Sequence, residues 1–489
     1  MSEYKIPYCE VKFHPHSFGD HRMRLFRWNG QVYRGISAEG VPFFTKLFQD
    51  GVIQRLTKQG LLIDSEVTHL GIDGYEMVVR HRAICFTSYP NEWCAAMLKD
   101  AALTLIELAI ELAQRGFTLG DGHPWNLLFD VDTCKPVFVD LGSILPIYES
   151  TWAAYDEFCR FCLYPLILMS HDRHQYARLL MCEDRGVLKS DILMLTPGSE
   201  LSSSSPKLSL VNQLESVLRQ RVPHSYRQQV KKTLNSIKLL WRKEPSELES
   251  PHLDFLENFK QKSHLSFLEN LKQEIESITL PDYKTEVSEP YKQSILDFSS
   301  QDTWTVKQQI LHKILTELQP ASVLDLGSGT GWYSLLAAVL GSKVVAFDTD
   351  EACVTQLYNQ ARENNLPILP LVMDFSKPTP SRGLSKHWAI AATKRLKCDL
   401  VLALALVHHI VLERRLNFDQ IVKGLAQFSR RWVVVEFIPP DDSEVVKGWS
   451  ERVSWYTLDN FIDALKKRFR SVTTMPSHPD RRVLLLCEK

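Results

Sequence analysis

Three glycines at alternate positions, Gly327, Gly329 and Gly331, follow a short apolar run that carries Asp325. Asp348 ends the next apolar run, 23 residues after Asp325. Glycine permits a tight turn and a close approach of the backbone to a ligand, and the helix start that follows offers unpaired N–H groups. Asp325 could hold a cation or a water near those groups, and a carboxylate at Asp348 can accept both hydroxyls of a ribose. The spacing therefore predicts a nucleoside-binding turn.

Two cofactors could use this turn. A dinucleotide requires Gly-x-Gly-x-x-Gly, and Trp332 stands where that third glycine would be, which weakens a nicotinamide interpretation. S-adenosyl-L-methionine has no pyrophosphate and does not need the third small residue. Its ammonium and sulfonium charges also suit a pocket that contains Asp325. The sequence favours S-adenosyl-L-methionine.

Strands that alternate with helices must position these residues. The apolar and helical patterns predict an α/β fold, a doubly wound parallel sheet of the Rossmann-like kind. Its last two strands are joined by a connection too short for a crossover helix, so we expect them to pair antiparallel. The seven expected strands are 322–326, 343–347, 369–372, 399–404, 432–437, 471–475 and 482–487.

With these features, the C-terminal part resembles a class I S-adenosylmethionine-dependent methyltransferase. The resemblance covers about 180 residues and rests on the run from Val323 to Trp332, the acid after the second strand and the antiparallel end of the sheet. It implies a ribose contact for Asp348 and an adenine-amine contact for Asp374. It further implies that Met373 and Phe375 flank the adenine, and that 402–405, including Ala403, lie beside the methionine part.

A histidine pair, His408 and His409, follows the fourth expected strand. Methyl transfer to a hydroxyl requires in-line approach and usually a base, and histidine suits that role near neutral pH. We favour His409 slightly over His408 as the base; otherwise either ring packs or caps the next helix. Glu436 ends the fifth strand at the same rim, where it could bind substrate or serve as a satisfied loop acid.

A second motif lies near the N-terminus, in Leu119–Phe129 and Pro136–Ser143. It is similar to the catalytic and metal loops of protein-kinase-like and aminoglycoside-phosphotransferase folds. That resemblance implies that Asp121 accepts a hydroxyl proton, while Asn126 and Asp140 hold Mg²⁺ against the phosphates of ATP. Gly120 departs from the usual His or Arg, and no complete phosphate-covering glycine loop is present. We therefore favour a degenerate α+β kinase-like domain that binds or orients substrate over an active one.

Lys46 has two interpretations in this scheme. It could pair with the phosphates, or it could be an exposed lysine of a strand.

Several phrases resemble one bacterial group of methyltransferases related to the nodulation protein NoeA. They are distributed over most of the chain, at 89–93, 98–102, 152–159, 365–374, 378–380, 406–410 and 435–437. The resemblance supplies no substrate.

The composition sets the broad class. The 489 residues should form several domains, and we expect a kinase-like domain at 1–195, a helical connector at 196–290 and a methyltransferase domain at 291–489. A formal charge of −1 argues against nucleic-acid binding, and no apolar run is long enough to span a membrane. The ten dispersed cysteines indicate reduced thiols in a cytoplasmic protein, with Cys159 and Cys162 in a core.

These observations leave three hypotheses. The favoured one is a methyltransferase that acts on an oxygen or nitrogen of a small molecule or saccharide. The second is a bifunctional kinase–methyltransferase that modifies a glycan or metabolite with ATP and Mg²⁺. The third is a scaffold that has lost both chemistries, against which the intact glycine turn counts. Oligomeric state and protein partners are not indicated.

Overall fold

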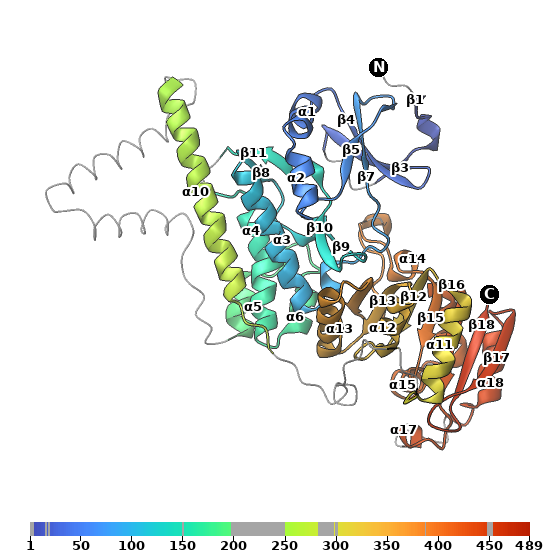
Figure 1. The fold of residues 1–489 in the computed structure, drawn as a ribbon. Coiled ribbons are helices and arrows are strands. Elements are labelled where there is room, and N and C mark those ends of the chain that lie inside the picture. The colour runs from blue at the N-terminus through green and yellow to red at the C-terminus, as the bar shows by residue number, and fades with distance from the viewer. Residues whose placement is uncertain are drawn as a thin grey trace. The chain divides into compact units, whose positions relative to one another are not determined.

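The computed structural model describes residues 4–14, 17, 20–148, 151–196, 250–281, 298, 302–386, 388–446 and 453–489. The chain, drawn as a ribbon in Figure 1, divides into two compact units that are each discontinuous in sequence. The first unit comprises Met1–Thr104, Trp125–Val139 and Leu280–Lys489, and the second Leu105–Pro124 and Asp140–Thr279. Much of the predicted connector, 197–249 and 282–290, lies outside the described residues. The division into three domains stays a prediction.

A seven-stranded sheet dominates the C-terminal part of the first unit, in the order β14-β13-β12-β15-β16-β18-β17. The first five of these strands run parallel, and β18 pairs antiparallel with both neighbours. This arrangement confirms the predicted seven strands and their antiparallel end. The strands are β12 Ser322–Leu326, β13 Lys343–Asp348, β14 Ile368–Val372, β15 Cys398–Ala403, β16 Ser429–Phe437, β17 Ser471–Pro476 and β18 Val483–Glu488.

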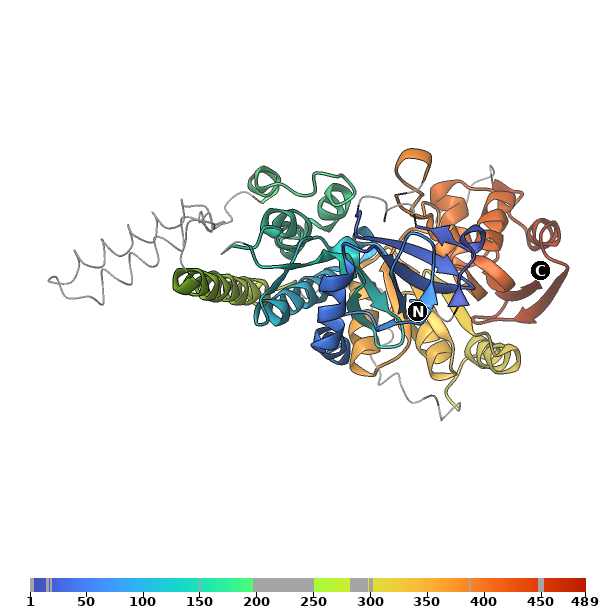
Figure 2. The ribbon, with the colours of Figure 1, turned by 90° about the horizontal axis from the view of Figure 1, so that it is seen from above.

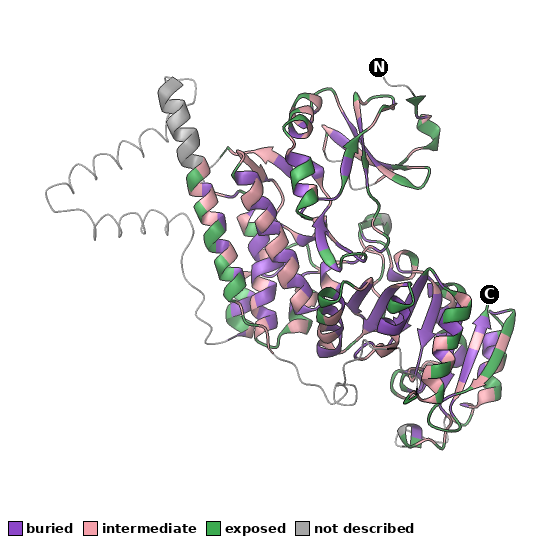
Figure 3. Ribbon diagram, in the orientation of Figure 1, coloured by how far each residue is buried: buried purple, intermediate pink, exposed green. Residues whose placement is uncertain are grey.

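Helices cover both faces of this sheet. All five residues of β12 are buried, as a central parallel strand requires (Figure 3). The strand order reverses direction at β12, so right-handed crossovers place the helices before and after this point on opposite faces, which Figure 2 shows. The helices are α11 Val306–Leu318, α12 Trp332–Val339, α13 Glu351–Glu363, α14 Ala392–Arg395, α15 Val407–Arg414, α16 Phe418–Phe428, α17 Ser443–Val446 and α18 Leu458–Lys466.

Side-chain caps explain where several of these helices begin. Thr305 and Gln308 form a capping box at the start of α11, and Asn417 with Gln420 does the same for α16. Asp350 accepts from the first amides of α13. These caps fix where each helix begins, and Asp350 does so two residues after the end of β13.

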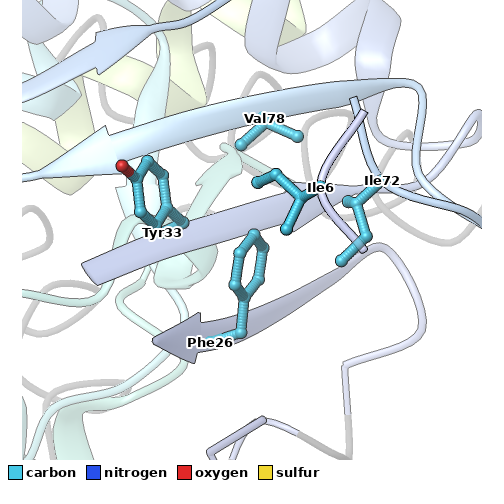
Figure 4. Close-up of a cluster of buried hydrophobic side chains, with 5 residues drawn as sticks. All are labelled: Ile6, Phe26, Tyr33, Ile72 and Val78. Carbon is cyan, nitrogen blue, oxygen red and sulfur yellow. The ribbon is translucent and has the colours of Figure 1, made fainter. Parts of the chain in front are cut away.

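A five-stranded antiparallel sheet forms the N-terminal part of the same unit, in the order β2-β3-β4-β7-β5. Asn29 and Gly30, both at positive φ, make the two-residue turn between β3 and β4. A buried cluster of Ile6, Phe26, Tyr33, Ile72 and Val78 packs on it (Figure 4). The strands are β2 Lys12–Phe13, β3 Met23–Trp28, β4 Gln31–Ile36, β5 Ser65–Val67 and β7 Met77–His81; β1 Tyr4–Lys5 pairs with β6 Leu70–Gly71, and β9 Leu127–Asp130 with β10 Lys135–Phe138.

Two helices connect β4 to β5: α1 Val41–Gln49 and α2 Val52–Lys58. Lys46 is an exposed residue of α1, so its expected place on a strand was wrong. The periodicity of Phe44 and Leu47, both buried on one helix face, explains the difference.

Polar contacts join the N-terminal residues of the first unit to its large sheet. The hydroxyl of Tyr358, on α13, donates to Asp100 over 2.6 Å, and Arg362 pairs with the same carboxylate at 2.6 Å. The ring of Tyr358 also meets that of Phe129 edge to face. Arg395, after the loop that follows β14, pairs with the buried Glu92. The two regions therefore share one packed interior.

The second unit is mainly helical. It contains the later turns of α3 Ala95–Ala113, a short pair of strands and a bundle that includes α10, whose Lys272 pairs with Glu107 and whose Phe267 contacts Tyr155. Helical structure at 250–277 agrees with the helical pattern expected there. The other elements are β8 Phe117–Leu119, β11 Ile144–Pro146, α4 Tyr155–Phe158, a π-helical turn Cys159–Leu163, α5 Tyr164–Ser170, α6 His174–Leu180, α7 Lys189–Leu195 and α10 Ser250–Ser277.

Cys159 and Cys162 are buried, and all ten cysteines are free thiols. Among the described residues, no helix combines the length and apolarity needed to cross a bilayer.

Candidate cofactor and acceptor site

The glycine turn lies between the end of β12 and the start of α12. Gly327, Gly329 and Gly331 all have positive φ, of 69°, 52° and 87°. A Cβ at Gly331 would lie 2.4 Å from Cδ1 of Leu357, so close packing against α13 also requires glycine there. The amides of Gly327 and Ser328 both donate to the carbonyl of Phe347, at the end of β13. The turn is thus held at the carboxyl edge of the parallel strands, where this fold class binds ligands.

Asp348 and Asp325 lie on either side of this turn. Oδ2 of Asp348 accepts from the amide of Gly329 over 2.7 Å, and Oδ1 accepts from the amide of Asp350. Burial raises the pKa of Asp348. Asp325 is buried and accepts from the hydroxyl of Ser334 over 2.7 Å. Burial, with the nearby Asp348 charge, raises the pKa of Asp325 to about 6 despite the Ser334 hydrogen bond.

The residues that the resemblance assigns to the adenine follow β14. Met373 is buried, and its amide donates to the carbonyl of Asp348. Asp374 accepts from both the amide and the hydroxyl of Ser376 and pairs with Arg414 at 3.3 Å. Phe375 packs toward α16. Its ring lies so close to Gly424 that a Cβ added there would be 2.9 Å from it. Ala403, at the end of β15, pairs in register with Leu326 and is buried.

The histidine pair begins α15. His408 is only 1% exposed, whereas the side chain of His409 is 55% exposed. Nδ1 of His409 lies 2.8 Å from Oε1 of Glu413, one turn later, and the two imidazole rings are 4.1 Å apart. Of the two, His409 is the one that an acceptor in solution can reach.

Glu436 is fully buried at the end of β16 and has three partners. Its Oε2 accepts from Lys307 Nζ at 2.6 Å and from the amide of Ala405 at 2.9 Å, and its Oε1 accepts from the Ser477 hydroxyl at 2.6 Å. No part of Glu436 is exposed, so an acceptor could contact it only after a neighbouring group moves. The substrate-binding role of Glu436 stays a prediction, and the geometry favours its alternative, a satisfied acid.

In the second unit, Asp121 lies two residues after the end of β8, with His123 and Glu157 close by. Potential ligand atoms of these three side chains all lie within 4.8 Å of one another. Glu157 accepts from the amide of Gly122 over 2.8 Å. Burial, together with the charges of Asp140 and Glu157, raises the pKa of Asp121, which His123 opposes.

The two residues expected to hold Mg²⁺ are placed by short turns. Asp140 caps Leu141–Ser143 by accepting from the amide of Gly142. Asn126, in the first unit, ends the turn Pro124–Asn126, and its carbonyl accepts from the amide of Val139.

Lys307, His123 and Glu157 were not identified from the sequence. His123 stands two residues after Asp121, a spacing that could have suggested it. Lys307 and Glu436 are separated by 129 positions, and Glu157 is 36 positions after Asp121, so only the fold unites them.

Comparison with known proteins finds one matching family model and several similar solved structures. The family model described as "Tellurite resistance protein TehB" matches residues 298–381, which contain the glycine turn, Asp325, Asp348 and Asp374. Magnesium protoporphyrin IX methyltransferase from Synechocystis PCC 6803, solved with bound SAM, is 17% identical, with a TM-score of 0.27, over 37% of this chain and 79% of its own. The bifunctional kinase-methyltransferase WbdD is 18% identical, with a TM-score of 0.28, over 37% of this chain and 38% of its own.

The seven-stranded sheet, its glycine turn and the matched family model define an enzyme of the methyltransferase class whose cofactor is S-adenosyl-L-methionine. Over nearly its whole length the chain is similar to one curated protein. This homologue is the nodulation protein NoeA of Rhizobium meliloti (strain 1021), 25% identical over 493 residues that cover 97% of this chain and 95% of the relative.

Proposed function

We propose that this protein transfers the methyl group of S-adenosyl-L-methionine to an oxygen or nitrogen of a small molecule or saccharide in the cytoplasm. The observation that carries the proposal is the grouping of the glycine turn, two acids and a histidine helix at one edge of the sheet. Leu326, just before the turn, pairs in register with Ala403, four residues before α15 begins. The cofactor turn and the histidines are therefore neighbours.

The residues present fit the cofactor. Asp348 retains lone pairs for ribose hydroxyls beyond its two amide contacts, and those contacts fix its orientation. Asp325 is a buried carboxylate whose ionised form an ammonium would favour. Asp374 would accept from the adenine amine, between Met373 and Phe375.

When bound, the cofactor supplies a methyl group that its sulfonium already activates. The chain then has to align the acceptor, exclude water and remove a proton. His409 would take that proton, and Glu413 would orient its ring through Nδ1, leaving Nε2 for the acceptor. His408 is buried, and the centre of its ring lies 4.1 Å from that of His409.

The class of methyl acceptor follows from the formal charge of the chain and from the proposed histidine base. A histidine base suits a hydroxyl or a neutral amine, and a formal charge of −1 does not favour a nucleic-acid backbone.

Two measurements test the proposal in order. Calorimetry of the full chain with S-adenosyl-L-methionine should show binding, which Asp348→Ala weakens; absence of heat would favour a scaffold. Transfer of a labelled methyl group into metabolite and polysaccharide extracts should then label a product with the wild-type chain and not with the Asp348→Ala variant. Cofactor binding without transfer to any extract would contradict the acceptor class.

A second candidate function is phosphotransfer at the N-terminal motif. The observation that favours it is the grouping of Asp121 with His123 and Glu157, close to the charge of Asp140. An oxygen donor such as the Asp140 carboxylate suits Mg²⁺. Asp121 would accept the proton of a hydroxyl substrate.

Magnesium-dependent ATP turnover distinguishes this candidate. Turnover that Asp140→Ala abolishes, and that Asp132→Ala on a different loop leaves intact, would support it. Absence of ATP binding would remove it without affecting the methyltransferase proposal.

A further inference from the structure

One lysine ammonium lies almost buried at the carboxyl edge of the large sheet. Lys307 belongs to the first turn of α11, its side chain is 12% exposed, and its Nζ is 2.6 Å from Oε2 of the fully buried Glu436. Burying an ammonium costs free energy unless an acid pairs with it. Glu436 is that acid.

The surroundings of this ammonium are the groups that border the cofactor turn. Nζ lies 5.6 Å from the centre of the Tyr333 ring, and Tyr333 is the second residue of α12. Lys307 is also near enough to Asp325 to lower the pKa of its carboxyl, although burial dominates. The ammonium is thus bounded by the ends of β12 and β16 and by the first turn of α12.

Glu436 and Lys307 differ in the hydrogen-bonding capacity that remains for a ligand. Both oxygens of Glu436 are engaged, by Lys307, the amide of Ala405 and the hydroxyl of Ser477. An ammonium has three N–H donors, and in the part of the chain that the structure describes one of them goes to Glu436. Lys307 can therefore donate to a further acceptor without losing its partner.

The cofactor carries such an acceptor. Its methionine part ends in an ammonium and a carboxylate, and the carboxylates of Asp325, Asp348 and Glu436 all repel the latter. We infer, on the basis of the proposed cofactor site, that Lys307 binds the carboxylate of the methionine part. Glu436 positions the Lys307 ammonium for this contact. Ala405, whose amide Glu436 also holds, follows the strand end where the methionine part is expected.

A cofactor analogue without the carboxylate tests this assignment directly. Calorimetry on the full chain would compare S-adenosyl-L-methionine with decarboxylated S-adenosylmethionine for wild type and Lys307→Met. A charge-assisted hydrogen bond predicts that Lys307→Met weakens binding of the complete cofactor by roughly 10- to 100-fold. Binding of the decarboxylated cofactor should change little, because it lacks the group that Lys307 contacts.

Controls separate this effect from a loss of folding. Lys307→Met leaves Glu436 buried without its cation, so the double variant Lys307→Met/Glu436→Gln removes both charges and should show the same selective loss. Lys343→Met, which breaks the ion pair with Asp132 at the opposite end of β13, should affect neither ligand. Lys307→Arg should retain most of the preference for the carboxylate.

The outcomes distinguish the assignment from the proposed function. If the double variant loses affinity equally for both ligands, or for neither, the role of Lys307 is overturned. The proposal that the chain binds the cofactor is then unaffected. If the wild-type chain binds neither ligand, the proposed function falls and the assignment with it.

Discussion

The amide of Gly329 donates to Oδ2 of Asp348 over 2.7 Å, and this bond joins the turn after β12 to the end of β13. The same carboxylate is the predicted partner of a ribose. The backbone of the turn that approaches the cofactor therefore sets the orientation of this carboxylate. Asp348 thus makes two contributions to cofactor binding: it holds the turn, and it would accept from the ribose.

Replacing Asp348 should separate these contributions. Asp348→Ala removes both the ribose acceptor and the bond to Gly329, and we expect the dissociation constant for S-adenosyl-L-methionine to rise by roughly 10- to 100-fold. Asp348→Asn retains an acceptor for the Gly329 amide and should lose less. Calorimetry would measure both, with the exposed Asp419→Asn as a control. Equal affinities for wild type and Asp348→Ala would refute the ribose contact.

Adding one methyl group at Gly331 should destabilise the fold for two reasons. Its φ of 87° costs an alanine about 1–2 kcal/mol, and the clash with Leu357 adds about 1–3 kcal/mol. Gly341→Ala provides the matched control, because Gly341 also has positive φ, 97°, but no atom lies within 4 Å of a Cβ there. Urea unfolding should show a larger loss for Gly331→Ala, and equal losses would mean that the turn does not need its close packing against α13.

Asp325 should make stability depend on pH. Its pKa in the folded protein is about 6, against about 3.9 in an unfolded chain, so the folded state binds the proton more tightly. Its contribution to stability is therefore greatest below about pH 4 and declines as the pH rises to about 6. Asp325→Asn should remove this decline in urea unfolding curves measured across that range.

The same carboxyl should affect cofactor affinity in the opposite direction. The cofactor's ammonium favours the ionised form, so affinity should increase as the pH rises through about 6. Asp348, Lys307 and Ser334 also surround Asp325, so the comparison with Asp325→Asn identifies its share. An affinity that depends on pH identically in both proteins would exclude Asp325 as the titrating group.

The exposed histidine should matter for turnover, and the buried one for folding. We expect His409→Gln to lower kcat about 100-fold or more with an acceptor identified by labelled transfer, with little change in cofactor affinity. His408→Gln should instead lower the melting temperature, because the residue is only 1% exposed. Full turnover by His409→Gln would show that the acceptor loses its proton elsewhere.

The fold of the large sheet was predictable because its determinants are local. Each apolar run, the group of three glycines and the short final connection can be recognised from a few consecutive residues. The strands observed differ from those expected by only a few residues at their ends. Lys46 was misplaced because apolar residues at helical spacing, Phe44 and Leu47, were interpreted as strand.

Side-chain partners were much less predictable. Nothing in the sequence around Lys307 indicates that it contacts Glu436, since the contact depends on how α11 packs against the large sheet. The same is true of Glu157 and the Gly122 amide. Roles for Asp374, Ala403, Asn126 and Asp140 came from resemblance and stay predictions.

The hydrogen bond between Tyr358 and Asp100 determines how this protein can be dissected. A fragment that starts near residue 291 would retain every strand of the large sheet yet leave a fully buried tyrosine without its acceptor and without Phe129. Such a fragment should aggregate even though its glycine turn is intact. Chimaeras that exchange the catalytic half between relatives would consequently need to carry residues 86–139 with it.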